Sequence, residues 1–356
     1  QGLPIDAVDM PDVITLIRSA GKSRTRFFLS TPNLNFLIGA ANDEAYRDTV
    51  IASDLNIADG MPLIWIARLL GLPIRHRLAG SDLLSALSAG QGDPEKPFRV
   101  MFFGGQEGAG AAACRAINDD PGRVVCTGHI YPGFKSIEEL SSADVIDQVN
   151  GIEADFLIVA LGARKGQLWL HRNADRLQAP VRSHLGALIN MAAGSIRRAP
   201  PLMQKAGLEW LWRIREEPAL WRRYLKDGSA LVGLMATRIL PLAVLQRWQA
   251  ARSAAYPFKA EIQRGSGGET VAMLHGMATA GDRDAVRRLC RDLAAAGAGI
   301  TLDMRGLAGA DPGFFGLLLV LKKHLSAAGL ALKIQAVSPG LKRCFRLNGV
   351  LFLLDE

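Results

Sequence analysis

Short apolar runs alternate with amphipathic stretches along the first half of the chain. Residues 155–161, DFLIVAL, form a continuous apolar run of the kind found in strands buried on both faces of a parallel sheet. Strands that alternate with helices in this way predict a layered α/β fold. The predicted strands are residues 26–30, 55–58, 98–103, 123–127, 155–161 and 185–191. The predicted helices are residues 12–20, 36–41, 62–70 and 137–149, one that follows Asp82 and one that ends at Asn118.

An Asp-Gly pair, Asp59 and Gly60, follows the second predicted strand. The next helix begins with Pro62 in its first turn, so the pair forms the turn between them. A carboxylate at this position lies in the crevice where open α/β sheets bind ligands, and Arg75, His76 and Arg77 follow about one helix later. Asp59 is therefore the candidate catalytic residue. The alternative is an ordinary turn aspartate.

Polar residues also follow the first predicted strand. Thr31 and Asn33 can hydrogen-bond to a ligand in the same crevice as Asp59, or they can cap the helix at residues 36–41. The sequence leaves both roles open.

A glycine-rich turn follows the strand at residues 98–103. Its first residues, Gly104 and Gly105, would let backbone N–H groups approach a diphosphate at the start of a helix. A dinucleotide site would also need an acidic residue at the end of the next strand, and that strand is followed by Gly128 and His129. The turn therefore favours a nucleotide other than NAD.

A basic loop is predicted after the run at residues 155–161. It contains Gly162, Arg164 and Lys165. Such a loop can hold phosphate, or it can be a solvated turn.

The character of the sequence changes over residues 203–252, where tryptophans and leucines are mixed with arginines. Arg238 and Pro241 interrupt the apolar run at residues 230–245, which argues against a membrane span and for an amphipathic segment at a membrane interface. Burial of these residues against the preceding domain is the alternative.

The pattern restarts at Tyr256 as a small α/β module. Its predicted strands are residues 258–263, 270–274, 299–304 and 331–336, and its predicted helices are residues 282–296, 313–329 and 340–347. We recognise no carboxylate pair, Cys/His cluster or phosphate loop in the sequence of this module, so binding or regulation is a better interpretation of it than catalysis. The chain is thus divided into domains at residues 1–200, 201–255 and 256–356.

Composition agrees with a globular protein, with 49% hydrophobic and 21% charged residues. Residues 1–196 carry 18 Lys and Arg against 21 Asp and Glu, whereas residues 197–255 carry 11 against 4. The partner of this basic segment should be anionic: phosphate, an acidic membrane surface or nucleic acid. The four cysteines are widely spaced and indicate neither a disulfide framework nor a zinc site, which fits a reducing compartment.

Several motifs, taken in order, resemble the WecG/TagA/CpsF family of glycosyltransferases over about residues 5–226. They are TPNLNF, ADGMPLIWIARLLG, RLAGSDLL, the FFGG turn, DFLIVALGARKGQLWL, MAAGSIRRAP and GLEWLWRIREEPALWRRYL. The resemblance implies a Rossmann-like layered domain with an amphipathic helical tail. It implies transfer of a sugar, with inversion and without a metal or other cofactor, from a UDP-sugar to a polyprenyl-diphosphate-linked saccharide. It also implies a cytoplasmic protein, peripheral on the inner face of the cell membrane.

The resemblance also implies roles for individual residues. Asp59 is the general base, Thr31 and Asn33 lie beside it, and Arg77 lies near the phosphates. The tail from Glu209 to Tyr224 closes the site, and its arginines that meet diphosphate are Arg213, Arg222 and Arg223. The other candidate substrate-binding residues are Asp82, Gly104, Gly105, Gly162, Lys165 and Arg198. Guanidinium groups suit phosphate because they can form two parallel hydrogen bonds with it.

Two departures from the family pattern concern the donor. Where the family usually has Pro-Lys-Gln-Glu, this chain has the run from Arg164 to Gln167, and where the family tends to have Phe-Asp, it has Ile189 and Asn190.

The terminal module resembles a STAS domain, a small α/β unit used in protein interaction. A phosphorylatable serine often follows the aspartate that is Asp311 here, and this chain has Pro312 and Gly313 instead. The expected role is therefore constitutive docking to a protein partner, or self-association.

These observations predict a glycosyltransferase of exopolysaccharide or cell-surface glycan synthesis. The alternative is a weak or inactive scaffold that binds nucleotide-sugar or lipid and recruits partners through its last domain. Nucleic acid is not expected as a partner, because the aromatic residues near the basic ones lie in Leu-rich amphipathic sequence and not on a strand platform.

Overall fold

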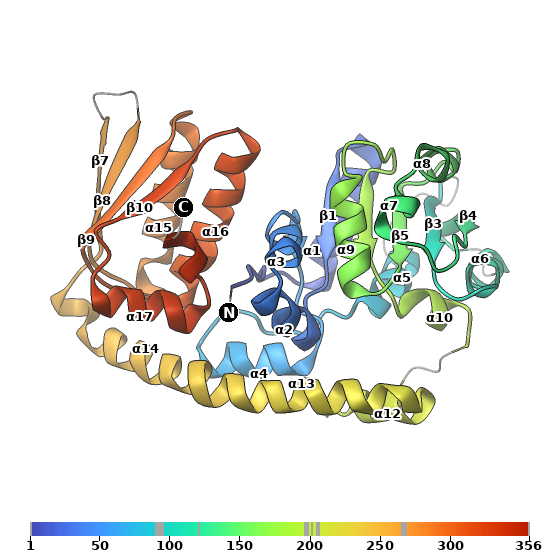
Figure 1. Cartoon of the computed structure of the whole chain (residues 1–356), viewed down its shortest axis with the longest axis horizontal. Helices are drawn as coiled ribbons and strands as arrows, with labels where there is room; N and C mark the ends of the chain where they lie inside the picture. Colours follow the sequence, from blue (N-terminus) through green and yellow to red (C-terminus); the bar gives the residue numbers. More distant parts are fainter. Residues whose placement is uncertain are drawn as a thin grey trace. The chain divides into compact units, whose positions relative to one another are not determined.

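The computed structural model describes residues 2–89, 96–119, 122–195, 199–200, 202–203, 207–264 and 269–354. The chain divides into two units. The N-terminal unit comprises Ile5–Trp65 and Ile74–Gly228, and the C-terminal unit comprises Gln1–Pro4, Ile66–Pro73 and Ser229–Glu356. Each unit has its own sheet (Figure 1).

The sheet of the N-terminal unit has six parallel strands in the order β2-β1-β6-β5-β3-β4. The strands are β1 Phe27–Ser30, β2 Leu55–Asn56, β3 Phe98–Gly104, β4 Val124–Ile130, β5 Phe156–Ala160 and β6 Val181–His184. Because all six are parallel, their carboxyl ends meet at one edge of the sheet. This confirms the layered α/β fold that the alternating pattern predicts and the Rossmann-like domain that the resemblance implies.

Helices cover both faces of this sheet. On β3, Val100 and Phe102 face one core, and Met101 and Phe103 face the other. The first core is closed by α1 Met10–Ser23, α5 Gly80–Ala89, α6 Ala109–Asp119 and α10 Leu188–Ala192, and the second by α7 Ile137–Leu140, α8 Ala143–Asn150 and α9 Ala163–Arg172. Trp169 of α9 is fully buried and stacks on Phe103 with ring centroids 4.5 Å apart. Burial of a side chain of this size contributes about 3 kcal/mol.

Three more helices of the N-terminal unit lie near the start of the chain. They are α2 Leu34–Asn42, α3 Glu44–Ile51 and α4 Met61–Leu69, the last of which extends into the C-terminal unit. The helix α3, capped by Asp43, was not predicted from the sequence. The predicted helix at residues 137–149 is instead two helices, α7 and α8, because the chain breaks at Ser141 and Ser142.

Two predictions near the carboxyl edge of the sheet are wrong. Residues 162–167 are not a loop: Gly162 has a φ of +85°, and α9 begins at the next residue, so Lys165 lies in its first turn. The predicted strand at residues 185–191 is also absent from the structure, because β6 ends at His184 and Leu188 begins α10. A short apolar run cannot be assigned to a strand or a helix by periodicity alone.

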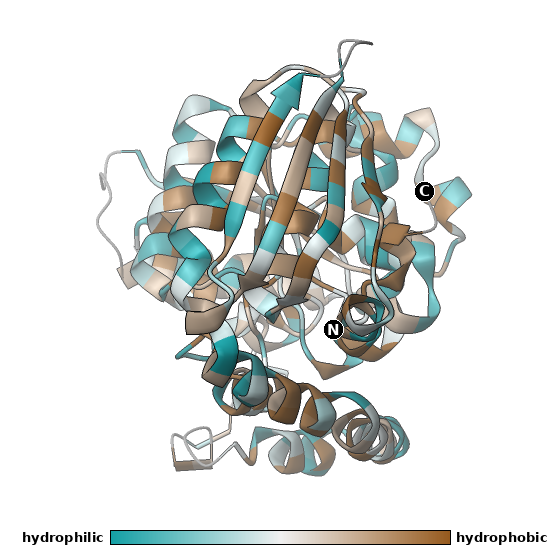
Figure 2. Ribbon diagram, turned by 90° about the vertical axis from the view of Figure 1, so that its left-hand side faces the viewer, coloured by the Kyte–Doolittle hydropathy of each residue, from teal (hydrophilic) through white to brown (hydrophobic). Residues whose placement is uncertain are grey.

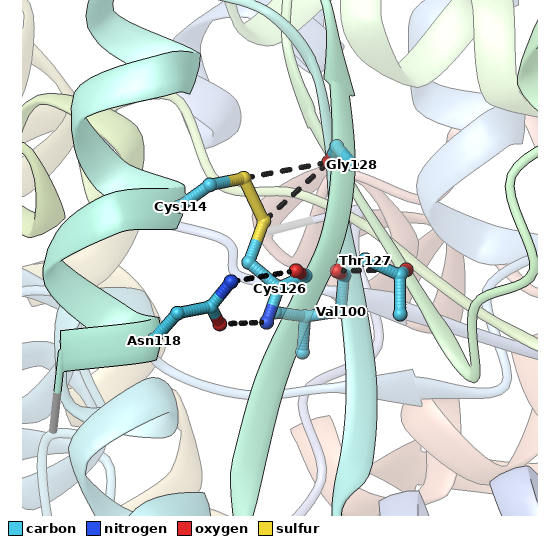
Figure 3. Close-up of a disulfide and its surroundings, with 6 residues drawn as sticks. All are labelled: Val100, Cys114, Asn118, Cys126, Thr127 and Gly128. Atoms are coloured by element: carbon cyan, nitrogen blue, oxygen red, sulfur yellow. Dashed lines mark hydrogen bonds between the residues drawn. A yellow bond between two sulfur atoms is a disulfide. The ribbon is translucent and has the colours of Figure 1, made fainter. Parts of the chain in front are cut away.

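A disulfide joins Cys114 of α6 to Cys126 of β4, with Cα atoms 5.0 Å apart (Figure 3). The side chain of Asn118 also holds Cys126: its Oδ1 accepts from the backbone N–H at 2.8 Å, and its Nδ2 donates to the carbonyl oxygen at 3.0 Å. The expectation of no disulfide is therefore wrong. Spacing along the chain does not reveal that the helix packs back against the strand that follows it.

The C-terminal unit contains a four-stranded sheet in the order β10-β9-β8-β7. Its elements are β7 Lys259–Arg264, β8 Thr270–Ala278, α15 Arg283–Ala295, β9 Ile300–Ala310, α16 Pro312–Ala327, β10 Leu332–Gln335 and α17 Pro339–Asn348. The predicted strands and helices of this module are thus confirmed. Only β7 is antiparallel to its neighbour among these strands. The three helices lie on one face of the sheet, and the other face, which is toward the viewer in Figure 2, carries hydrophilic and hydrophobic residues side by side.

A long helical stretch follows the parallel sheet in sequence. It comprises α12 Glu209–Glu216, α13 Trp221–Leu234, a π-helical turn at Met235–Ile239, and α14 Leu240–Arg252. From Pro218 to Ala255 it is one helix of 38 residues, and by length and composition alone it is long and apolar enough to cross a membrane. The argument against a span was that Arg238 and Pro241 interrupt the apolar run. In the structure the helix continues through both residues, with a π-helical turn at Met235–Ile239, so the interruption does not exclude a span. Length and composition do not distinguish a spanning helix from a surface or core helix.

Candidate functional site

Asp59 lies just beyond the carboxyl end of β2, as predicted. Its backbone N–H donates to the carbonyl oxygen of Pro32 at 2.8 Å, which joins the chain after β2 to the chain after β1. Its side-chain Oδ2 accepts from the N–H of Gly80, the first residue of α5, at 3.5 Å. Gly60 follows with a φ of +128°, a conformation that a residue with a side chain rarely adopts, and α4 begins immediately afterwards. The carboxylate is therefore held where three segments meet at the carboxyl edge of the sheet.

The carboxyl group of Asp59 has an unusual proton affinity. Burial raises its pKa to about 6, although Arg77 and the N–H of Gly80 act in the opposite direction. Glu209 and Asp82 raise the pKa further because they add negative charge nearby. A pKa in this range suits a general base that works near neutral pH.

Arg77 lies beside Asp59, and its guanidinium donates to the carboxylate of Glu209 in α12. Only 14% of the Arg77 side chain and 15% of the Glu209 side chain are exposed. The role of Glu209 was not predicted: in the sequence it only marks the start of the tail. Arg77 was predicted to lie near phosphates, and in this structure its partner is a carboxylate of the protein.

The two polar residues after β1 have different surroundings. Asn33 caps α2: its Oδ1 accepts from the N–H of Phe36 at 3.2 Å, so the structure shows the capping role. A Cβ on Gly60 would be 3.7 Å from the Cβ of Asn33, which places this cap next to the Asp59 turn. Thr31 is buried, and its side chain packs near Gly80.

The chain after β6, from Leu185 into the first turn of α10, connects this region to the glycine-rich turn. Leu185 packs against Gly80, and Ile189 packs against Gly105, where an added Cβ would be 3.0 Å from it. Gly104 and Gly105 have φ values of +96° and +86°, and the N–H of Gly105 donates to the carbonyl oxygen of Ala160 at 2.8 Å. This N–H group, which was predicted to face a diphosphate, is thus bonded to the protein.

The basic residues after β5 are also bonded to protein groups. The guanidinium of Arg164 pairs with Asp43, and the ammonium group of Lys165 donates to the carbonyl oxygen of Lys135. Gly162 serves as the N-cap residue of α9.

His184, which was not predicted, ends β6 at this edge. Its imidazole is buried against Gly166, where an added Cβ would lie 2.3 Å from Cδ2. Burial lowers its pKa to about 4, so the ring is neutral at physiological pH. Its Nε2 has no hydrogen-bond partner among the residues that the structure describes. Nothing in the local sequence distinguishes this histidine. The feature that sets it apart is a tertiary contact, the packing of a glycine of α9 against its ring.

The predicted tail arginines are on α12 and α13. Arg213 pairs with Glu217 at 3.2 Å, and Arg222 and Arg223 are exposed and lie over the rings of Trp221 and Tyr224. Asp82 is in the first turn of α5 and faces Asp59 and Arg77. Arg198 lies outside the described residues. The site that the structure assembles therefore contains Thr31, Asn33, Asp59, Arg77, Asp82 and Glu209.

No group of three or more His, Cys, Asp or Glu side chains is placed to hold a metal ion within the described parts of the chain.

Comparison with known proteins gives one family. A sequence model of the glycosyl transferase WecG/TagA/CpsF family matches residues 1–243. An N-acetylglucosaminyldiphosphoundecaprenol N-acetyl-beta-D-mannosaminyltransferase of Bacillus spizizenii is 27% identical over 199 residues, 56% of this chain and 74% of that protein. Proteins of the same name from Staphylococcus aureus strain MRSA252 and Bacillus subtilis are 23% and 24% identical, over 60% and 55% of this chain and 82% and 74% of their own. The family match spans more than half of the chain, including the parallel sheet and the Asp59 region, and the chain therefore belongs to the WecG/TagA/CpsF family of glycosyl transferases.

Proposed function

We propose that this glycosyltransferase moves a sugar, with inversion, from a UDP-sugar to a saccharide linked to polyprenyl diphosphate, and that Asp59 is its general base. The observation that carries the proposal is the carboxyl group of Asp59 at the carboxyl edge of the sheet, with its pKa raised to about 6. The names of the relatives, which describe transfer to a diphosphoundecaprenol-linked sugar, support the class of acceptor.

The chemistry follows from the position of that carboxylate. The acceptor hydroxyl attacks the anomeric carbon of the donor while Asp59 takes its proton, and the bond from that carbon to the diphosphate of UDP breaks. The departing diphosphate carries away negative charge and needs positive partners. The arginines of the tail, two of them exposed, are the candidates for this role.

The direct test is a transfer assay followed by mass spectrometry. The acceptor is N-acetylglucosaminyldiphosphoundecaprenol, and the donors are UDP-N-acetylmannosamine and other UDP-sugars. We expect Asp59→Asn to lose at least about 100-fold in kcat, the usual lower range for removal of a general base, while UDP binding is retained. The matched control is Asp175→Asn, because that carboxylate is 88% exposed and pairs with Arg26 at the surface. Undiminished turnover in Asp59→Asn would remove Asp59 from the mechanism.

A second candidate function is a binding scaffold with little or no turnover. It is favoured by one observation: the side chains of Arg77, Arg164 and Lys165 are all bonded to protein groups in this structure. Tight binding of UDP with no transfer from any donor would support it.

We further propose that the enzyme is a peripheral protein on the cytoplasmic face of the membrane, in a pathway that makes exopolysaccharide or another cell-surface glycan. The support is the helix Pro218–Ala255, which exposes large apolar side chains together with arginines. The most exposed of these apolar residues are Leu225, Val232 and Val244. The test is flotation of the full chain with anionic phosphatidylglycerol vesicles. Val232→Glu and Val244→Glu should reduce flotation, and the control Val320→Glu, at an exposed position of α16, should not.

For the C-terminal unit we propose a STAS-like docking or self-association role. One supporting observation is the mixed sheet with helices on one face. The other is the N-cap residue Asp311, which Pro312 follows. Light scattering of the full chain measures self-association directly.

A further inference from the structure

The ion pair between Arg77 and Glu209 joins residues 132 positions apart in the sequence. Both side chains are largely withdrawn from water. An exposed ion pair contributes little to geometry, whereas in a buried pair each charge depends on the other, because either one alone would be buried and uncompensated. This pair therefore fixes the position of the Arg77 side chain.

Arg77 depends on such a partner because it lies between α4 and α5, in a segment with neither helix nor strand. The backbone is fixed next to it, where the N–H of Leu78 donates to the carbonyl oxygen of Ala58 at 2.9 Å. Glu209 comes from a regular element, since it is in the first turn of α12. A carboxylate is favoured there because the start of a helix carries partial positive charge.

Charges from three segments face Asp59. Arg77 comes from the segment before α5, Asp82 comes from α5 itself, and Glu209 comes from α12. Arg77 is thus one cation among three carboxyl groups, and all three stabilise its charged form. The position of the Arg77 guanidinium among these carboxyl groups therefore determines how far it offsets the negative charge around Asp59.

We propose that Glu209 is a positioning residue: its carboxylate holds the guanidinium of Arg77 beside Asp59 and Asp82, so that the arrival of α12 completes the charge environment of the general base. This inference rests on the proposed role of Asp59 and adds to it a residue of the tail that acts through Arg77.

The test uses Glu209→Gln and Arg77→Gln in the full chain. The pKa of Asp59 is measured by ¹³C NMR titration of Asp-labelled protein, with its signal assigned by its loss in Asp59→Asn. The pH dependence of kcat/KM is measured in parallel. Glu209→Gln releases the guanidinium of Arg77 from its place beside Asp59. The pKa of Asp59 and the acidic limb of the rate profile should then move up by about half a pH unit or more, because the effect of Arg77 on Asp59 is larger than that of Glu209. Arg77→Gln removes the same cation, so both should move up in this variant as well.

The direction of the shift in Glu209→Gln separates positioning from two other roles. If the pair only fastens α12, either substitution exposes Asp59 to water, and both variants lower its pKa. If Glu209 acts only through its own charge, Glu209→Gln lowers the pKa of Asp59 whereas Arg77→Gln raises it. Either result would overturn the proposal. A Glu209→Gln titration that superimposes on the wild type would overturn it as well. Glu138→Gln is the matched control, because that carboxylate is in an exposed pair with Arg172 and should leave the titration unchanged.

The two readouts also separate this inference from the proposed function. Upward shifts in both NMR titrations without any change in the rate profile would support the positioning role of Glu209 and show that Asp59 is not the base. Unchanged titrations together with loss of activity in Asp59→Asn would keep the base and reject the positioning role.

Discussion

Replacement of Asp59 by asparagine should stabilise the protein while it removes activity. The pKa of this carboxyl group is about 6 in the folded chain, against 3.8 in the unfolded chain. The folded state therefore binds the proton more tightly. Between pH 3.8 and about pH 6 the stability of the wild type falls as pH rises. The reason is that the folded state must then hold a charge that is better solvated in the unfolded chain.

The size of the effect follows from the same two pKa values. Their difference of about two units corresponds to about 3 kcal/mol. Asparagine has nearly the shape of the neutral acid and carries no charge. The free energy of unfolding of Asp59→Asn should therefore exceed that of the wild type by about 1.5 kcal/mol at pH 5 and by about 3 kcal/mol at pH 8, as an upper limit. Such a gain is expected where a catalytic group is held in an unfavourable environment.

The assay is urea unfolding at pH 5, 6, 7 and 8. Unfolding is monitored by hydrogen exchange of peptides from the parallel sheet, so that the N-terminal unit is measured separately. Asp175→Asn, at an exposed position, should show no difference that grows with pH. A stability difference between Asp59→Asn and the wild type that stays constant from pH 5 to pH 8, or a variant less stable than the wild type at pH 8, would refute the reasoning.

Three further predictions concern packing and the disulfide. Peptide mapping without reductant should recover Cys114 linked to Cys126, and Cys126→Ala should lower the free energy of unfolding by about 2 to 3 kcal/mol because the bond closes a short loop, with a sequence separation of 12; free thiols at both positions in the purified protein would contradict this. Gly166→Ala should lower the free energy of unfolding by about 1 to 3 kcal/mol, since its methyl group would lie 2.3 Å from the ring of His184. A melting temperature equal to that of the wild type would contradict this and show that the ring can move. Gly276→Ala should destabilise the C-terminal unit by more than 1 kcal/mol, because its φ is +80° and the new Cβ would meet a backbone carbonyl oxygen at 2.1 Å; urea unfolding measures the loss, and a loss below that value would count against the strain.

Much of the fold could be predicted from the sequence because its signals are local. The continuous apolar run at residues 155–161 could be assigned to a buried strand, and the whole terminal module could be divided correctly into strands and helices. The position of Asp59 at the end of a strand also followed from local pattern, since the Asp-Gly turn and Pro62 mark where one element ends and the next begins. Local pattern failed where it was ambiguous: the run at residues 185–191 is apolar enough for a strand, but it contains the start of α10.

The functional site depended on contacts that the sequence does not encode locally. Glu209 meets Arg77 only because α12 returns to the carboxyl edge of the sheet, and His184 is buried only because Gly166 has no side chain. The disulfide likewise required α6 to pack against β4. The sequence by itself determined most of the strands and helices and placed Asp59, the proposed base, at the end of a strand. The tertiary structure decided which charges surround that residue, because burial and the approach of distant segments set its proton affinity.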